Sequence, residues 1–261
     1  MTRKLPAGTC IGHAVNSVQN NLAYAFRISW PWYAVLAVVS IVTFGLLGML
    51  AAGGNADLMP YGVFFIVLLS FVAFASIAVN WHRYILLDEV PRAGDLFRLD
   101  GKTWRYLGNL ILIGLIMLLL GAIVMVPLAL LAGAITSSVV VSVVVILGLI
   151  VFLFLAIFSF RLSVKLPAVA IGRQDFTFSH ALAATRGNTL QLFLILLFQV
   201  VLAIAASLFL LFLNFVTAFI HPIFGLAVGM LVQLFINWIL TIFGITILTS
   251  LYGFFVEGRE F

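Results

Sequence analysis

Charged side chains are scarce in this chain. They make up 8% of its 261 residues, whereas hydrophobic side chains make up 65%. Soluble globular domains use about 25% charged residues, so this composition excludes a soluble fold. Several apolar runs are also longer than the roughly 18 residues at which a helix can cross the hydrocarbon core of a bilayer. The sequence therefore predicts an all-α, polytopic membrane protein.

Cysteine is nearly missing, and so are the residue patterns of metal and nucleotide sites. Cys10 is the only cysteine, so no disulfide can form within the chain. The four histidines are far apart in the sequence and show none of the HxxxH or HExxH spacings of metal sites. No Walker loop, dinucleotide fingerprint or nucleophile elbow is present. We expect no metal, no cofactor and no catalytic residue, and hence a protein that is not an enzyme.

Ionisable residues are absent from the middle of every apolar run. Ion-coupled pumps and proton relays usually carry such residues inside the membrane, so the sequence disfavours these classes. Three amide side chains remain as candidate intramembrane polar contacts: Gln199, Gln233 and Asn237. Gln233 and Asn237 are four residues apart and share one face of a helix. Such residues are typical of hydrogen bonds between helices, and the alternative is that they line a polar cleft.

The apolar runs divide the chain into three parts. Residues 1–29 form an amphipathic N-terminal segment, residues 30–253 contain the runs, and residues 254–261 form a C-terminal tail. Short turns join the runs in pairs, which predicts three transmembrane hairpins. The six expected spans are 30–52, 61–79, 107–131, 139–160, 190–213 and 223–253.

All 13 Lys and Arg residues lie on one side of this arrangement, in the two terminal segments and in the loops after the second and fourth spans. Basic residues concentrate on the cytoplasmic side of membrane proteins. The distribution predicts a multi-pass protein of the bacterial cytoplasmic (inner) membrane with both termini in the cytoplasm. It also accounts for the net charge of +5 without nucleic acid as a partner, and the expected partners are membrane phospholipids.

The two basic loops differ in their charge balance. The interval 80–108 mixes basic with acidic residues, which favours a structural ion-pair cluster of Arg83, Asp88 and Glu89. In the loop after the fourth span basic residues predominate, which favours contacts with anionic lipid headgroups, worth about 1 kcal/mol each. These candidate lipid contacts are Arg161, Lys165, Arg173 and Arg186.

A repeat accompanies the hairpins. Each one follows a segment with helical periodicity, at 9–27, 95–105 and 175–186, and an arginine closes each segment. These arginines recur at intervals of about 80 residues, and self-similarity at a fixed spacing is the signature of repeated units. We expect three units, each a cytoplasmic interfacial helix followed by a hairpin. The alternative is that any three hairpins under the same charge rule look alike.

The last span contains a GxxxG pattern, formed by Gly225 and Gly229. Small residues at this spacing let two helix backbones approach closely. With six spans in one chain, we expect the pattern to seat a neighbouring helix of the same chain rather than a second copy.

Two segments resemble known membrane proteins. HRYILLDEVP at 82–91, followed by WRYLG at 104–108, is similar to a pattern of uncharacterised bacterial inner-membrane proteins. FSHALAATRGN at 178–188 resembles a segment before a span in relatives of the membrane domain of glycerophosphoryl diester phosphodiesterases. The pattern similar to 82–91 tends to have Gly before its Glu, where this chain has Asp88. In multidomain relatives catalysis belongs to a separate soluble domain, so the resemblance implies a multi-pass bacterial membrane protein without catalytic residues of its own.

Together these observations favour a non-catalytic accessory or lipid-interacting membrane protein. The alternative function is a transporter or channel for a small apolar or amphipathic solute. A water-filled cavity lined by the three amide side chains would favour transport, whereas a dry, packed bundle would favour the accessory role.

Overall fold

The computed structural model describes residues 3–54, 56–134 and 137–261, and within them the chain is all-α, without a β-strand. Six of the described helices are long and apolar enough to cross a membrane, so the chain is a multi-pass membrane protein, as predicted. These helices are α2 (Leu22–Ala52), α3 (Met59–Leu87), α4 (Gly101–Ala134), α5 (Ser138–Ser163), α8 (Thr189–Ala218) and α9 (Pro222–Phe255). The shorter elements are α1 (Ala7–Asn20), η1 (Ala56–Leu58), η2 (Ala93–Asp95), α6 (Lys165–Ala170) and α7 (Phe178–Ala184).

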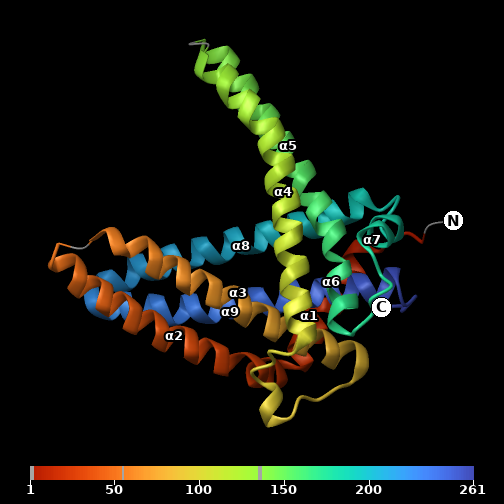
Figure 1. Ribbon diagram of the computed structural model, residues 1–261, viewed down its shortest axis with the longest axis horizontal. Helices are drawn as coiled ribbons and strands as arrows, with labels where there is room; N and C mark the ends of the chain where they lie inside the picture. Colours follow the sequence, from red (N-terminus) through yellow and green to blue (C-terminus); the bar gives the residue numbers. More distant parts are fainter. Residues whose placement is uncertain (1–2, 55, 135–136) are drawn as a thin grey trace.

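The long helices pack as three hairpins, α2–α3, α4–α5 and α8–α9. In Figure 1 the first and third hairpins extend to the left, whereas α4–α5 projects upward, across their direction. Gly225 allows the close approach of α9 to α8, because a Cβ there would lie 3.1 Å from the backbone carbonyl carbon of Thr217. A Cβ on Gly229 would meet the side chain of Asn214. The GxxxG pattern therefore seats a helix of the same chain, as predicted.

The hairpins meet at one end of the molecule, which we call the base. It comprises α1, α6, α7 and the segments 88–100 and 256–261, together with the adjoining ends of the long helices (Figure 1). The largest fully buried side chains, Trp81, Tyr106 and Tyr252, come from α3, α4 and α9 and lie there. Farther from the base many long apolar side chains are exposed, as suits a surface surrounded by equally apolar lipid chains. Packing at the base holds the three hairpins together.

The helical segment predicted at 9–27 is divided in the structure. Asn21 leaves helical geometry, and its side-chain amide donates to the carbonyl oxygen of Ser17 at 2.8 Å, which satisfies an acceptor at the end of α1. The first turn of α1 follows Pro6, so the helix begins before the predicted residue 9, and proline suits this position because it has no N–H to satisfy. Helix α1 packs against α8 and α9, and its buried residues are Cys10, Ala14 and Val18.

The prediction of a separate helix at 95–105 is wrong. Residues 96–100 are not helical, and α4 itself begins at Gly101. Asp100 ends the irregular stretch, because its carboxylate accepts the backbone N–H groups of Lys102 at 3.0 Å and Thr103 at 3.1 Å. A carboxylate in this position starts a helix and prevents its continuation backwards. The second hairpin therefore has no short helix of its own in front of it.

The segment predicted at 175–186 contains a shorter helix, α7. Thr177 caps its start by accepting the backbone N–H of His180 at 3.3 Å, and Gly187 (φ +77°) follows its end in the left-handed conformation that favours glycine. Asn188 then ties the N-terminal segment to α8: its Oδ1 accepts the backbone N–H of Leu5 at 2.8 Å. Short helices thus precede the first and third hairpins, and their location at a membrane surface stays a prediction.

The long helices also extend farther toward the base than the predicted spans. Helix α3 continues to Leu87 rather than to residue 79, so His82 and Arg83 are helical. Most of the polar interval 80–108 is therefore helix, and only residues 88–100 form the connection, with one turn at η2. The apolar runs located the spans, but polar residues at the base continue the same helices because the protein interior there supplies their hydrogen bonds.

Candidate functional site

His82 lies at the junction of the three hairpins. It is fully buried on α3, its Nδ1 is 2.8 Å from Thr249 Oγ1 on α9, and its Nε2 is 3.3 Å from the Tyr106 hydroxyl on α4. Thr249 donates its own proton to the carbonyl oxygen of Ile245, so it accepts from His82. Nε2 then accepts the hydroxyl proton of Tyr106. This chain of hydrogen bonds joins one helix from each hairpin, and no sequence pattern predicted that its three members would meet.

The predicted ion-pair cluster forms, with one change of membership. Arg83 is paired with Glu89, and its Nη1 donates to the carbonyl oxygen of Ala170 at 3.2 Å. Arg98 also donates to Glu89, at 2.9 Å, and the side chains of Arg83 and Arg98 are only 10% and 7% exposed. Asp88 is exposed and takes the left-handed position after α3 (φ +53°) instead. Hydrogen bonds from Arg83, with those from Arg98, lower the pKa of Glu89 to about 2.

Three arginines at the base bind the carbonyl ends of other helices. Arg83 of α3 binds Ala170, the last residue of α6. Arg161 of α5 donates to the carbonyl oxygen of Leu182 on α7 at 2.7 Å, and Arg259, after α9, donates to that of Leu86 on α3 at 3.0 Å. A cation at a helix C-terminus is favoured by the orphan carbonyl groups and by the helix dipole. These contacts hold α6 against α3, α7 against α5, and the C-terminal segment against α3.

A basic pocket of about 300 Å³ lies beside these contacts. Its cations come from three segments: Arg105 is on α4, Lys165 is on α6, and Arg173 follows α6. The remaining lining residues are Asn109, Val169, Gly172, Gln174 and Phe176. Because no acidic side chain lines it, the pocket can hold an anion.

The side chains around the pocket are held in place by neighbours. Arg173 donates to the Tyr252 hydroxyl at 3.2 Å and is paired with Asp175 at 3.0 Å. This pairing lowers the pKa of Asp175, and the bonds to Asp175 and Tyr252 raise the pKa of Arg173. The ammonium of Lys165 lies 4.1 Å from the centre of the Phe178 ring, a cation–π geometry. Arg173 and Lys165 are therefore oriented before any ligand arrives, whereas the Arg105 side chain is exposed.

The four residues predicted to contact lipid headgroups do not form one cluster. Lys165 and Arg173 line the pocket, whereas Arg161 is engaged with α7 through Leu182 and, at 2.9 Å, Thr185. Arg186 is exposed and is not part of the pocket lining. Arg105 takes the third basic position, together with Asn109, one helical turn along α4. In the sequence, Arg105 and Asn109 are four residues apart at the start of the third span, a spacing that places them on the same face of a helix.

The three predicted intramembrane amides are not brought together. Gln199 on α8 lies against Gly244 of α9, with its Oε1 3.9 Å from the position of a Cβ there. Gln233 and Asn237 bond each other at 3.0 Å on an exposed face of α9. Gln233 lies eleven residues from Gly244, about 16 Å along the helix. The polar cleft that would favour transport is therefore not formed by these residues.

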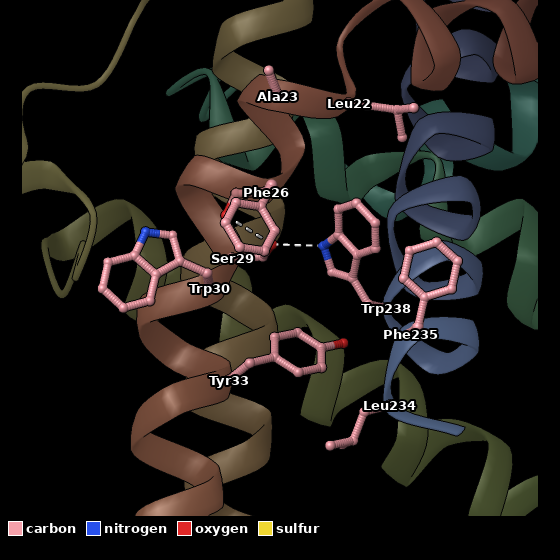
Figure 2. Close-up of a pocket in the computed structure, with 9 residues that line it drawn as sticks. All are labelled: Leu22, Ala23, Phe26, Ser29, Trp30, Tyr33, Leu234, Phe235 and Trp238. Atoms are coloured by element: carbon pink, nitrogen blue, oxygen red, sulfur yellow. Dashed lines mark hydrogen bonds between the residues drawn. The ribbon is translucent and has the colours of Figure 1, made fainter. Parts of the chain in front are cut away.

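An apolar groove of about 580 Å³ separates α2 from α9. Figure 2 shows Trp238 of α9 pointing across it to Ser29 of α2, and the indole Nε1 donates to Ser29 Oγ at 2.7 Å. Ser29 donates in turn to the carbonyl oxygen of Ala25 at 2.6 Å, so its hydroxyl is occupied. The other lining residues are Leu22, Ala23, Phe26, Trp30, Tyr33, Leu234 and Phe235. The groove suits apolar groups and offers no chemistry for catalysis.

Known proteins give no indication of what this site binds. No protein-family model, no curated protein and no solved structure matches this chain. Among the residues that the structure describes, no three His, Cys, Asp or Glu side chains come close enough to bind a metal ion. The basic pocket is the arrangement with the clearest chemical selectivity.

Proposed function

We propose that this protein is a non-catalytic, lipid-interacting membrane protein that holds an anionic phospholipid headgroup in its basic pocket. One observation carries the proposal: Arg105, Lys165 and Arg173 converge from three segments on a single cavity without an acidic lining residue. Basic residues collect on one side of the membrane in many membrane proteins, but that rule requires no cavity. It therefore does not explain why these three basic side chains line the same one.

The surroundings of the pocket support a lipid rather than a soluble anion. Trp104, adjacent to Arg105, is 52% exposed, and tryptophan is enriched at the level of lipid headgroups. The pocket also lies at the base ends of α4 and α6, where the apolar stretch of the third span begins. A phosphodiester there has its charge among the three cations and its acyl chains beside the exposed apolar surface of the hairpins.

The location of the protein belongs to the same proposal. The segregation of all 13 basic residues to one side supports a bacterial inner-membrane protein with the base in the cytoplasm. Anionic lipids give that leaflet a negative surface potential, which attracts basic groups. The resemblance to membrane domains of glycerophosphoryl diester phosphodiesterases also supports a role next to phospholipids.

The test is selective retention of anionic lipid. The purified protein is incubated in mild detergent with equal amounts of phosphatidylglycerol and phosphatidylcholine, and the bound lipid is then quantified. We expect phosphatidylglycerol to be retained preferentially. The double variant Arg105→Gln with Lys165→Gln should bind it roughly 10- to 30-fold more weakly, since each basic group contributes about 1 kcal/mol.

The matched control changes the same net charge outside the pocket. Arg92 and Arg186 are exposed and do not line it, so Arg92→Gln with Arg186→Gln should leave retention nearly unchanged. An equal loss in both double variants would show diffuse attraction and contradict a pocket. Competition with excess inorganic phosphate distinguishes the source of the anion: displacement of the lipid would assign the pocket to a soluble phosphate compound instead.

A further inference from the structure

A polar pair stands on the exposed face of α9, in the half of the helix away from the base. Gln233 and Asn237 are both exposed and are bonded to each other at 3.0 Å. On the same face Leu226 and Met230 are 60% and 59% exposed. Side-chain amides that face hydrocarbon lose the hydrogen bonds that water would supply. One bond between the two amides leaves part of this loss uncompensated.

The unbonded donors and acceptors of this amide pair are complementary to those of a second, identical pair. A single hydrogen bond between two carboxamides leaves one oxygen acceptor and at least one N–H donor open, whichever way each amide is oriented. A second copy related by a two-fold axis places the open oxygen of each pair opposite the open N–H of the other. Such an isologous contact satisfies both pairs at once. Lipid chains and apolar helices offer neither group.

The spacing of the exposed residues fits the same partner. Leu226, Met230, Gln233 and Asn237 follow one another at intervals of four, three and four residues, which is the spacing of the seam between two parallel helices. Two copies inserted in the membrane in the same direction present their α9 helices in parallel. A polar residue in such a seam fixes the register of the pair. The contact with α8 through Gly225 and Gly229 uses a neighbouring face.

We propose that this chain forms a symmetric dimer through α9, in which Gln233 and Asn237 of each copy are hydrogen-bonded to their counterparts in the other. This inference is independent of the lipid-binding proposal, because its residues lie outside the basic pocket. It gives the exposed amides a structural role that the single chain does not provide.

Cysteine cross-linking in native membranes tests the dimer. Met230→Cys introduces a thiol on the proposed seam, and oxidation with copper phenanthroline is expected to give a disulfide-linked dimer of the full chain. Leu231→Cys is the matched control, because Leu231 is 68% exposed at the same depth but points away from the seam. The unmodified chain serves as the blank, since its Cys10 is buried.

The amides are tested in the same background. Adding Gln233→Ala and Asn237→Ala to Met230→Cys should lower the cross-linked fraction about 3- to 15-fold, from the strength of polar contacts between membrane helices. Absence of a dimer for Met230→Cys, equal cross-linking at Leu231→Cys, or an unchanged yield after removal of both amides would each overturn the proposal. A cross-linked product with a different protein would assign the face to that partner and also overturn it.

Discussion

At the scale of single residues, the base is held together by polar side chains that share partners. Arg83 and Arg98 are both nearly buried and meet on the carboxylate of Glu89. Breaking a buried charge pair is costly because the remaining charge has lost its water without a partner. Glu89 is about one-third exposed, which moderates that cost. The pH dependence of stability reports this cluster directly.

We predict that the stability of the protein in detergent falls as the pH is lowered from about 4.5 to about 2. The pKa of Glu89 is lowered in the folded protein from 4.5 to about 2. Its contribution is therefore complete above pH 4.5 and disappears as the carboxylate is protonated on the way to pH 2. Allowing for solvent screening, the loss is about 1–2 kcal/mol. Thermal unfolding followed by circular dichroism measures it.

The variant Glu89→Gln should already lack this contribution at neutral pH and should show a flatter profile in that window. Asp88→Asn provides the control, because Asp88 is exposed beside the cluster and Asn accepts the left-handed backbone conformation at this position. If Asp88→Asn flattens the profile as much as Glu89→Gln, the effect belongs to surface charge in general and not to the Arg83–Glu89–Arg98 cluster.

At the scale of helices, the contacts of each hairpin differ from one end to the other. Near the base the helices carry buried polar groups and arginines that bind the carbonyl ends of neighbouring helices, as Arg161 does at α7. Toward the far end close packing depends on small residues, as at Gly225. Such contacts are made by Arg83 near the end of α3, Arg161 near the end of α5 and Arg259 after α9, whereas the short helix that the repeat predicts before α4 is missing. Superposition of the three hairpins remains a prediction.

The replacement Gly225→Ala is predicted to destabilise the α8–α9 hairpin. Its new Cβ would lie 3.1 Å and 3.2 Å from backbone atoms of Thr217 and Ala218, so the two helices must separate. Overpacking of this kind costs about 1–3 kcal/mol. Unfolding in a titration with sodium dodecyl sulfate should shift to lower detergent fractions.

Gly114→Ala on α4 is the matched control, because its Cβ would meet no atom within 4 Å. This change should be neutral or stabilising, by up to about 1 kcal/mol, since alanine favours a helix more than glycine does. Equal destabilisation by both replacements would mean that loss of glycine, and not contact with α8, is responsible.

At the scale of the whole molecule, three hairpins extend from one base. The third hairpin contacts α1, α3 and α6 near the base, and α4–α5 contacts α3, α6, α7 and α8. The hydrogen bonds of His82 connect all three hairpins at that end. Both described termini lie there as well (Figure 1). The basic pocket, lined from α4, α6 and the segment after α6, also belongs to the base, whereas the proposed dimer seam lies on α9 away from it.

The orientation of the base is tested with fusion reporters. A reporter active only outside the cytoplasm should work after Gly54, Ser137 or His221, at the far ends of the hairpins, and should fail after Gly94, Gly172 or Phe261. The physical reason is the confinement of all 13 basic residues to the base side. Activity after Gly94 would reverse the orientation and remove the basis for contacts with the cytoplasmic leaflet.

The sequence alone determined the helical membrane class, the six spans and their pairing. These features depend on long apolar runs and short turns, which are local, and a lipid environment requires each run to satisfy its own backbone hydrogen bonds as a helix. The pairing of Arg83 with Glu89 was also predictable, because the two residues are only six apart. The helix predicted at 95–105 failed at Asp100, whose capping bonds are local but compete with the periodic pattern.

Only the tertiary structure decided what the base contains. The basic pocket joins Arg105 to Lys165 and Arg173, and the His82 chain reaches Thr249, 167 residues away. Contacts over such distances leave no periodic signal, since they depend on how the hairpins pack against one another. The same reason explains why Gln199 lies between α8 and α9, apart from Gln233 and Asn237 on the exposed face of α9. The sequence shows which face of its own helix a residue occupies, whereas packing decides which face becomes buried.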